Sequence, residues 1–506
     1  MKKINTLLLV LCIAIFSSCD NDDNSNSQDT PLNTTVNFQY KSTINVGGEG
    51  ASEISAFDAV TNKLYVVNVA SNQISVFDIS DINAPLQEAP IDLSIYGAPN
   101  SVAVKDGKLA IAVEAAVKQD PGKILVYNTA DDSLLNQYNV GALPDMVTFS
   151  KDGNLIISAN EGEPNDDYTV DPMGTISIID LADSTTTTLD FTSFNTQQAA
   201  LEAQGFRVFG PGATLAQDVE PEYVAVSEDS QTAWVSLQEN NGMAKVNLIS
   251  KTIEAIYPFG FKDHSIAGNE LDVSDKDGLT TLKNWPVFGM YQPDAIVNVN
   301  INGTDYIISA NEGDSRDYDG FSEEDRVDDL TLDETVFPLT EDYQNEINLG
   351  RLKTTNTLGD IDNDGDNDVI YSYGARSFSV WSANGNLVYD SGNSIATETL
   401  ALTPNRFNDE DKRSDDKGAE PEAVEVLNIG NERYILFVGL ERTDQVMVYD
   451  ITNPTAPTFL SVLSHAGDEA PEGVLIIPAI TSPTGNDLLV VSNEDSGTVS
   501  FYENEQ

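Results

Sequence analysis

A three-strand pattern repeated along the chain is the feature that most limits the possible folds. Each unit has a strand that begins near an acidic or amide residue, a hydrophobic strand that usually ends in an acid, and a third strand. The units run from Glu53 to Asp78, Asn100 to Tyr127, Asp145 to Asp180, Glu222 to Leu248, Asp294 to Trp381, Glu422 to Asp450 and Glu472 to Tyr502. A fourth strand that ends near Gly follows, as in Leu135 to Gly141. Such units bury their apolar faces by packing on their neighbours, so the pattern predicts an all-β repeat architecture.

The last of the seven units lacks its fourth strand, because the chain ends shortly after Tyr502. The segment from Phe38 to Gly47 has the missing pattern and precedes the first unit. A β-propeller closes in this way, with one blade built from both ends of the chain. An open β-solenoid, the alternative, would not need complementary ends. We therefore predict an all-β fold, a single seven-bladed β-propeller over residues 37–506 that an N-terminal strand closes, with no separable second domain.

The N-terminus has the pattern of an export signal. Two lysines precede an apolar run at 7–16, and Ser17 and Ser18 lead to Cys19. We predict a signal peptide over 1–18, with Cys19 as the lipidated first mature residue, because this ending resembles a bacterial lipobox. Ordinary secretory cleavage is the alternative.

Residues 19–36 are polar and acidic and are expected to form a flexible tether. An acidic run directly after the cysteine resembles the surface-export signal of some bacterial lipoproteins, so we expect an outer-membrane protein at the cell surface, with the periplasmic face as the alternative.

The net charge and the scarcity of cysteine and histidine exclude several functions. The chain has 82 Asp and Glu against 26 Lys and Arg, a net charge of −56. This charge repels phosphate backbones and anionic lipids, so we expect no nucleic-acid partner and no membrane contact beyond the lipid anchor. The two cysteines, Cys12 and Cys19, precede the body, and the two histidines are His264 and His465. The body therefore has no disulfide, no thiolate metal site and no multi-histidine zinc site.

Four long connections are expected on one face of the propeller. In this fold the connections from the fourth strand to the next blade and from the second to the third strand emerge together. The long ones are residues 185–218, 261–291, 313–370 and 393–419. Long loops on one rim of a rigid scaffold are the usual place for a binding or catalytic site. We expect a monomer with its site on this rim.

Acidic residues are concentrated at the same rim. First strands begin with Glu53, Asn100, Asp145, Glu222, Asp294, Glu422 and Glu472, and second strands end at Asn68, Glu114, Glu161, Glu239, Glu312, Glu441 and Glu494. So many buried carboxylates need cations or raised pKa values, and oxygen ligands alone suit Ca²⁺. Alternatively, these acids bond backbone amides and lock neighbouring blades together. The predicted Ca²⁺ ligands are Glu161, Glu222, Asp294, Glu312, Glu422 and Glu472.

A second calcium site is predicted in the long loop of the fifth unit. Its alternating acids are Asp360, Asp362, Asp364, Asp366 and Asp368, with Gly365 at the sixth place. This pattern matches the first half of an EF-hand loop, but Tyr371 stands where the last acid would be. A solvated acidic loop is the alternative interpretation.

Basic residues are scarce, so those near strand ends are candidate site residues. Arg316, Arg376 and Arg442 could bind a phosphate or a carboxylate through two hydrogen bonds. They could equally neutralise neighbouring glutamates.

Several motifs together resemble the choice-of-anchor I family, also described as mesenchyme-specific cell-surface glycoprotein-like. They are Ala159-Asn-Glu-Gly-Glu-Pro164, Ala310-Asn-Glu-Gly-Asp-Ser-Arg316, Gly374-Ala-Arg-Ser-Phe378, Arg413-Ser-Asp-Asp-Lys-Gly-Ala-Glu-Pro-Glu422, Gly439-Leu-Glu-Arg442, Val448-Tyr-Asp-Ile-Thr-Asn-Pro454 and Pro471-Glu-Gly473. The resemblance covers about residues 40–503 and implies a secreted propeller, with lipid on Cys19 as its anchor. Ala419 replaces a Pro that is common in the family pattern. Some relatives are labelled alkaline phosphatases.

Two functions are compatible with these features. The first is a calcium-stabilised cell-surface binding module whose ligand is unknown. The second is a calcium-dependent phosphatase or phosphodiesterase that acts on a phosphoester, by analogy with calcium-dependent propeller phosphatases and phytases. Its candidate catalytic residues are Glu422, Arg376, Arg316 and Arg442. Other hydrolases, such as an esterase or a lactonase, would use the same rim.

Overall fold

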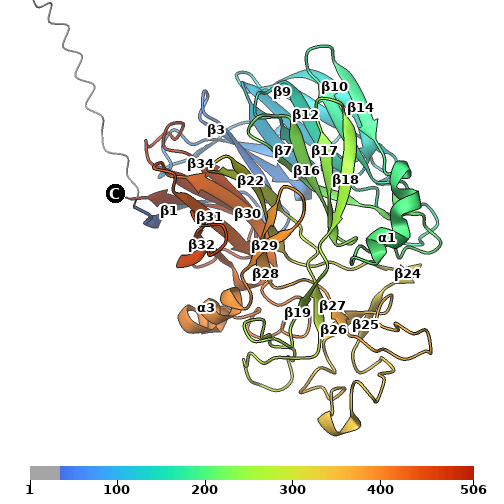
Figure 1. Cartoon of the computed structure of the whole chain (residues 1–506). Helices are drawn as coiled ribbons and strands as arrows, with labels where there is room; N and C mark the ends of the chain where they lie inside the picture. Colours follow the sequence, from blue (N-terminus) through green and yellow to red (C-terminus); the bar gives the residue numbers. More distant parts are fainter. Residues whose placement is uncertain (1–34, 506) are drawn as a thin grey trace, which may run out of the picture.

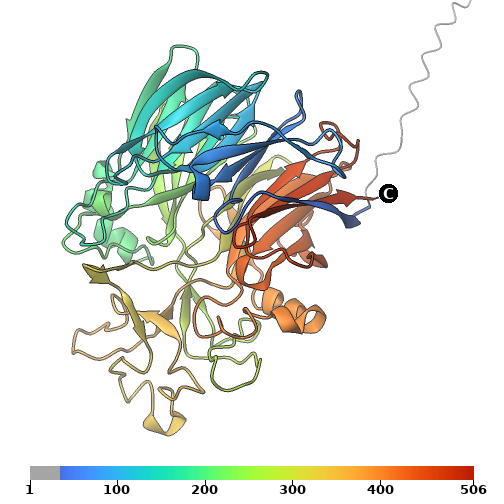
Figure 2. The same ribbon diagram turned by 180° about the vertical axis from the view of Figure 1, so that it is seen from behind.

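The computed structural model describes residues 35–505 and has the predicted ring (Figures 1 and 2). The predicted signal peptide, Cys19 and most of the predicted tether lie outside the described residues. Strand β1 (Phe38–Asn45) pairs antiparallel with β36 (Thr498–Asn504), with Phe38 opposite Asn504 and Asn45 opposite Thr498. The N-terminal strand therefore completes the C-terminal sheet, and the prediction of an all-β, seven-bladed propeller is confirmed.

The seven blades follow one another along the chain. The four strands of a blade are called a, b, c and d in order from the central channel outward, so strand a is the first strand of each unit. Blade 1 contains β2 (Ser55–Asp58), β3 (Lys63–Asn68), β4 (Gln73–Asp78), β5 (Leu86–Gln87) and β6 (Ile91–Asp92). Blade 2 contains β7 (Pro99–Lys105), β8 (Lys108–Val113), β9 (Pro121–Asn128) and β10 (Ser133–Ala142). Blade 3 contains β11 (Pro144–Phe149), β12 (Leu155–Asn160), β13 (Thr175–Asp180) and β14 (Thr185–Leu189). Blade 4 contains β15 (Pro221–Val226), β16 (Thr232–Leu237), β17 (Gly242–Asn247) and β18 (Thr252–Pro258).

Of the remaining blades, blade 5 is interrupted by a long connection between its second and third strands, and blade 7 is shared between the chain ends. Blade 5 contains β21 (Ile296–Ile301), β22 (Thr304–Asn311), β28 (Ser377–Ser382) and β29 (Leu387–Asp390). Blade 6 contains β30 (Pro421–Asn428), β31 (Tyr434–Leu440), β32 (Gln445–Asp450) and β33 (Thr458–Leu463). Blade 7 contains β34 (Pro471–Ile477), β35 (Leu488–Asn493), β36 and β1.

The core lies between the blades. Seven hydrophobic clusters each join two neighbouring blades, and together they continue around the whole ring. Strands inside a blade are therefore covered on both faces, which explains continuous apolar runs such as Leu64–Val67 in β3, where every residue is buried. Strand β1 takes part in the closure, because Phe38 belongs to the cluster between blades 6 and 7 and Ile44 to the cluster between blades 7 and 1.

Two of the long connections form a further sheet that the sequence did not predict. Strands β19 (Phe261–Asp263), β20 (Phe288–Met290), β27 (Tyr371–Ser372), β26 (Lys353–Thr355) and β25 (Glu324–Arg326) pair in this order. A separate hydrophobic cluster that includes Trp285, Val327 and Leu352 packs this region. We call residues 261–291 and 313–372 the inserted region; it lies below the blades in Figure 1.

The inserted region and the other connections also contain short elements. They are η1 (Val69–Ser71), η2 (Thr192–Gln197), α1 (Gln198–Glu202), α2 (Leu215–Asp218), β23 (Asp317–Tyr318), β24 (Phe321–Ser322), η3 (Leu339–Glu341), α3 (Ser394–Leu402), η4 (Pro404–Arg406) and η5 (Glu441–Thr443). The loop expected at 185–218 begins later, because Thr185–Leu189 pairs with β13 as the fourth strand of blade 3. Within residues 35–505, no helix has the length and hydropathy needed to cross a membrane.

Candidate functional site: an acidic channel mouth

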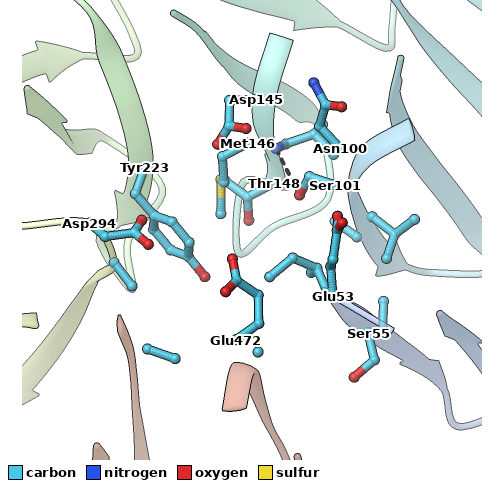
Figure 3. Close-up of a pocket in the computed structure, with 18 of the residues that line it drawn as sticks. Glu53, Ser55, Asn100, Ser101, Asp145, Met146, Thr148, Tyr223, Asp294 and Glu472 are labelled. Atoms are coloured by element: carbon cyan, nitrogen blue, oxygen red, sulfur yellow. Dashed lines mark hydrogen bonds between the residues drawn. The ribbon is translucent and has the colours of Figure 1, made fainter. Parts of the chain in front are cut away.

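A cavity of about 630 Å³ lies where the first strands of all seven blades meet. Its lining includes the residue at the start of each of these strands: Glu53, Asn100, Asp145, Glu222, Asp294, Glu422 and Glu472. Figure 3 shows Glu53, Asp294, Glu472 and the hydroxyl end of Tyr223 extending into this space from different blades. The repeated pattern in the sequence therefore places one polar or acidic side chain per blade around a common centre.

A local irregularity aims these side chains at the channel. In five blades the strand begins with Pro, and the pairing register between strands a and b shifts immediately after it, as between Pro144 and Val147 or between Pro221 and Val224. Pro lacks the N–H that would continue the ladder, and a bulge turns the following side chain out of the regular alternation. The Pro–acid pairs thus place a carboxylate at the channel mouth.

The first carboxylate group consists of Asp145, Glu161 and Glu222, which come from strand a of blade 3, the end of its strand b and strand a of blade 4. Their oxygen atoms lie within 4.8 Å of one another. The Glu161 side chain is only 8% exposed, and Glu222 Oε2 is buried without a hydrogen-bond partner among the described residues. These oxygen atoms could hold one metal ion.

The second carboxylate group consists of Asp294, Glu312 and Glu422, at the corresponding positions of blades 5 and 6. Glu422 is 7% exposed, and its Oε2 likewise lacks a partner among the described residues. A third carboxylate group consists of Glu312, Glu420 and Glu441. The structure thus brings together five of the six predicted channel ligands in two groups. Glu472 lines the same cavity outside the groups found among residues 35–505.

Burial raises the pKa values of these carboxyls. It raises the pKa of Glu53 to about 8 and that of Asp145 to about 7, and like charges nearby add to both effects. The pKa of Glu312 is raised to about 8 by burial, although the Lys417 ammonium opposes this shift. The pKa values of Glu161 and Glu222 lie well above the usual range for the same reasons. The channel mouth therefore favours either protons or bound cations.

The three arginines that the sequence singled out contact other protein groups. Arg316, whose side chain is 1% exposed, lies 2.7 Å from Asp218 Oδ1 and 2.8 Å from Glu220 Oε2. Arg376 donates to the backbone carbonyls of Asp272, Ser414 and Asp416, at 2.6, 2.9 and 2.6 Å. Arg442 lies 2.7 Å from Glu441 Oε1 and 3.3 Å from Glu420 Oε2. Arg316 and Arg442 therefore neutralise neighbouring acids, and Arg376 holds loop backbone in place. None of the three arginines lines the cavity.

The aspartate-rich loop brings some of its predicted ligands together. Asp360, Asp362 and Asp368 form one group, while Asp366 and Asp368 form another with Asp333. The carboxylate of Asp360 accepts hydrogen bonds from the N–H groups of Asp364 and Gly365, both at 3.1 Å. Asp364 belongs to neither group. All of these side chains are exposed or half-buried, in contrast to the channel carboxylates.

Sequence reasoning missed two site residues, Asp145 and Asp333, and it missed the grouping of Glu420 with Glu441. Asp145 was recognised as the start of a strand but was not included among the ligands, although its place after Pro144 is the signal shared with Glu222. Glu420 and Glu441 form the third group because the loop before blade 6 folds against the end of β31. Asp333 joins the aspartate-rich loop through an isolated bridge between Leu332 and Asn367, for which the sequence has no signal.

Comparisons with known proteins identify a family and relatives. The model of the Choice-of-anchor I domain family matches residues 53–454. Gigasin-3a of Magallana gigas is 36% identical over 189 aligned residues, with coverage of 31% of this chain and 66% of that protein. Similar solved structures include hydrazine synthase of Kuenenia stuttgartiensis, with 10% identity, a TM-score of 0.48 and coverage of 90% of this chain and 96% of that one. Another is the Cps50 (Swd1) β-propeller domain of Myceliophteria thermophila, with 7% identity, a TM-score of 0.47 and coverage of 93% and 100%.

Proposed function

The chain belongs to the choice-of-anchor I domain family, and from this premise we propose that it is a calcium-stabilised binding module held at the cell surface by a lipid on Cys19. Its site is the acidic channel mouth. The proposal follows from one observation: all seven blades contribute a polar or acidic side chain to one cavity, and the carboxyls there are shielded from water.

The donor set suits calcium. Both channel groups offer carboxylate oxygens alone, which Ca²⁺ prefers over softer metals. Two buried oxygens of these groups, on Glu222 and Glu422, lack a hydrogen-bond partner among the described residues. An unpartnered buried carboxylate oxygen is costly, and a divalent cation would offset that cost. A bound ion would also leave coordination positions for the oxygen atoms of a ligand.

Calcium in the aspartate-rich loop would have a separate, structural role. The loop belongs to the inserted region, and its two acidic groups connect residues 360–368 with Asp333. Repulsion from Asp364 contributes to a raised pKa of Asp362, and a cation would relieve this repulsion. We propose that calcium there orders the inserted region and takes no part in ligand binding.

A calcium-dependent phosphatase is less well supported by the geometry. Such a reaction needs positive groups to offset the charge on the phosphoryl oxygens. Lys118 is the one basic residue among the described residues that line the cavity. Arg316, Arg376 and Arg442 are held outside it by acids or by backbone carbonyls.

The test compares calcium with a chelator on the chain from residue 19 onward, with Cys19→Ser. We expect calcium to raise the free energy of unfolding by about 3 kcal/mol at a concentration of 100 Kd. Glu222→Gln should reduce this gain, while Glu254→Gln, a half-exposed glutamate of β18, should not. Hydrolysis of an aryl phosphate is measured in parallel. Calcium-dependent turnover that Glu422→Ala abolishes would replace the binding module by a metallophosphatase.

The anchor is tested separately in cells. Wild-type protein should sediment with outer membranes and be cleaved by protease added to whole cells. Cys19→Ser should release the protein into a soluble fraction. Sedimentation that is unchanged by this substitution would contradict the lipid anchor, and protection from added protease would place the module on the periplasmic side.

A further inference from the structure

The first and second carboxylate groups are built from the same sequence elements. Strand b ends in Ser158-Ala-Asn-Glu-Gly162 in blade 3 and in Ser309-Ala-Asn-Glu-Gly313 in blade 5. The first strand of the next blade begins within Glu220-Pro-Glu222 after blade 3 and within Glu420-Pro-Glu422 after blade 5. The two groups are therefore equivalent positions of the repeat.

The shared motifs fix the carboxylates in the same way. Asn160 donates to Ser177 Oγ at 3.0 Å, and Asn311 donates to Ser379 Oγ at 2.8 Å, so each buried amide ties the end of strand b to strand c. Gly162 and Gly313 both have positive φ, and a Cβ at Gly313 would approach the backbone nitrogen of Gly374, in the segment before β28, to 2.1 Å. The glutamate between Asn and Gly is thus held at the channel in both blades.

The first glutamate of each Glu-Pro-Glu motif pairs with an arginine, although Glu420 also belongs to the third carboxylate group with Glu312. Arg316 pairs with Glu220, and Arg413 pairs with Glu420 at 2.7 Å. Both glutamates are at most 3% exposed. The second glutamate of each motif, Glu222 or Glu422, lines the cavity. The two groups therefore have the same carboxylate arrangement.

The groups differ in their counter-charge. Lys417 lies at the second group, where Nζ contacts Glu312 Oε1 and lies 3.5 Å from Asp314 Oδ1 and 3.8 Å from Glu420 Oε2. The other oxygen of Glu312 accepts a hydrogen bond from Gln238 Nε2 at 2.9 Å. Both oxygens of this glutamate are thus already engaged within the protein, and the ammonium supplies a positive charge where an ion would bind.

Among the described residues, no cation forms an ion pair with a carboxylate of the first group, although the charge of Lys118 opposes the raised pKa of Asp145. Within residues 35–505, no side chain donates a hydrogen bond to the Glu161 carboxylate or forms an ion pair with it, although Glu161 is only 8% exposed. Lys118 lies nearby but pairs with Glu163 at 3.4 Å, and its side chain is 54% exposed. Gln217 stands five residues before Glu222, at the place that Lys417 has before Glu422.

We infer that Lys417 is an internal replacement for a metal ion at the second carboxylate group, so that the channel binds one divalent cation, at Asp145, Glu161 and Glu222. This inference rests on the proposal that the channel binds calcium. The repeat provides two equivalent sites, and one lysine assigns them different roles. The ion belongs to blades 3 and 4, while the ammonium joins the loop before blade 6 to blade 5.

The test counts bound Ca²⁺ by equilibrium dialysis on the chain from residue 19 onward, with Cys19→Ser. Lys417→Gln, which introduces the residue found at the matching place of the first group, should add one bound ion per chain. Lys417→Arg should add none, because the positive charge is kept. Lys412→Gln, an exposed lysine of the same loop, is the matched control and should also add none.

A second pair of variants decides the matter without relying on Lys417. Glu161→Gln should remove one bound ion per chain, and Glu312→Gln should leave the number unchanged. The reverse pattern, or an unchanged number in a folded Lys417→Gln variant, would overturn the inference while leaving calcium binding in place. Equal numbers in wild type, Glu161→Gln and Glu312→Gln would overturn both this inference and the proposed channel site.

Discussion

The ring and the inserted region are held together in different ways. The ring repeats one contact seven times, and each blade packs on both neighbours through an apolar cluster. The inserted region has one cluster of its own and joins segments that are distant in sequence, such as β20 and β27. The ring therefore depends on closure, whereas the inserted region depends on a few unique contacts.

The largest effect should come from opening the ring. Deletion of residues 35–45 removes β1 and exposes β36 as an unpaired edge. Loss of the buried Phe38 and Ile44 alone should cost more than about 5 kcal/mol of unfolding free energy. Chemical denaturation measures this change, with Gln39→Ala on the exposed side of β1 as the control. A deletion variant as stable as wild type would show that closure contributes little.

The next effect tests the link between the two regions. Arg207, 2% exposed, pairs with the fully buried Glu323 of the inserted region and donates to the carbonyl of Glu239 in the ring at 3.0 Å. Arg207→Met should cost about 3–5 kcal/mol, because it leaves a buried carboxylate unpaired. Adding Glu323→Gln should recover part of this loss in a double-mutant cycle. Additive effects of the two substitutions would show that the pair does not join the regions.

A smaller, local effect should distinguish the inserted region from the ring. Trp285 is buried in the separate cluster, with Lys283 Nζ 3.8 Å from its ring centre. Trp285→Ala should lower the free energy of local opening by about 3 kcal/mol. Hydrogen exchange should then accelerate in residues 261–291 and 324–372 and stay unchanged in the blades. Leu339→Ala, at an exposed side chain, is the control, and faster exchange throughout the ring would contradict separate stabilities.

The last effect concerns the pH dependence of the free energy of unfolding and should arise from the carboxyls of the ring. Burial raises the pKa values of Glu53 and Glu312 to about 8, so their protonated forms are favoured in the folded state. The stability they contribute is fully present below their ordinary pKa of about 4 and is lost as pH rises towards 8. In chelator, the free energy of unfolding should therefore fall between pH 5 and pH 8. Glu53→Gln should reduce this fall in the free energy of unfolding with pH. A stability that rises between pH 5 and pH 8 would contradict the prediction.

The repeat explains why so much of the ring could be predicted. Because each blade repeats the pattern, a strand that is hard to recognise in one unit can be assigned from the same position in the others. The unpaired strands at Phe38 and Tyr502 predicted the closure. The acids that follow Pro at the channel were predictable for the same reason. The groupings with Glu161 and Glu312 depend on packing between blades, which the order of strands already implies.

The inserted region could not be predicted because its contacts occur once. Nothing in the sequence near Phe288 indicates that it pairs with Tyr371. The arginines could be predicted only in part. The sequence places them beside strand ends, but the direction of each side chain depends on partners that are distant in the sequence. Arg316 points to Asp218 because a carboxylate from the connection before blade 4 is buried there, and Arg376 points to carbonyls of two different loops.

The most direct test of the central claim is an anomalous difference map from crystals grown with calcium and then exchanged into terbium. We predict a peak in the channel about 2.3–2.6 Å from oxygens of Asp145, Glu161 and Glu222. A well-ordered channel with no peak, although the aspartate-rich loop holds an ion, would contradict a calcium site at the channel mouth.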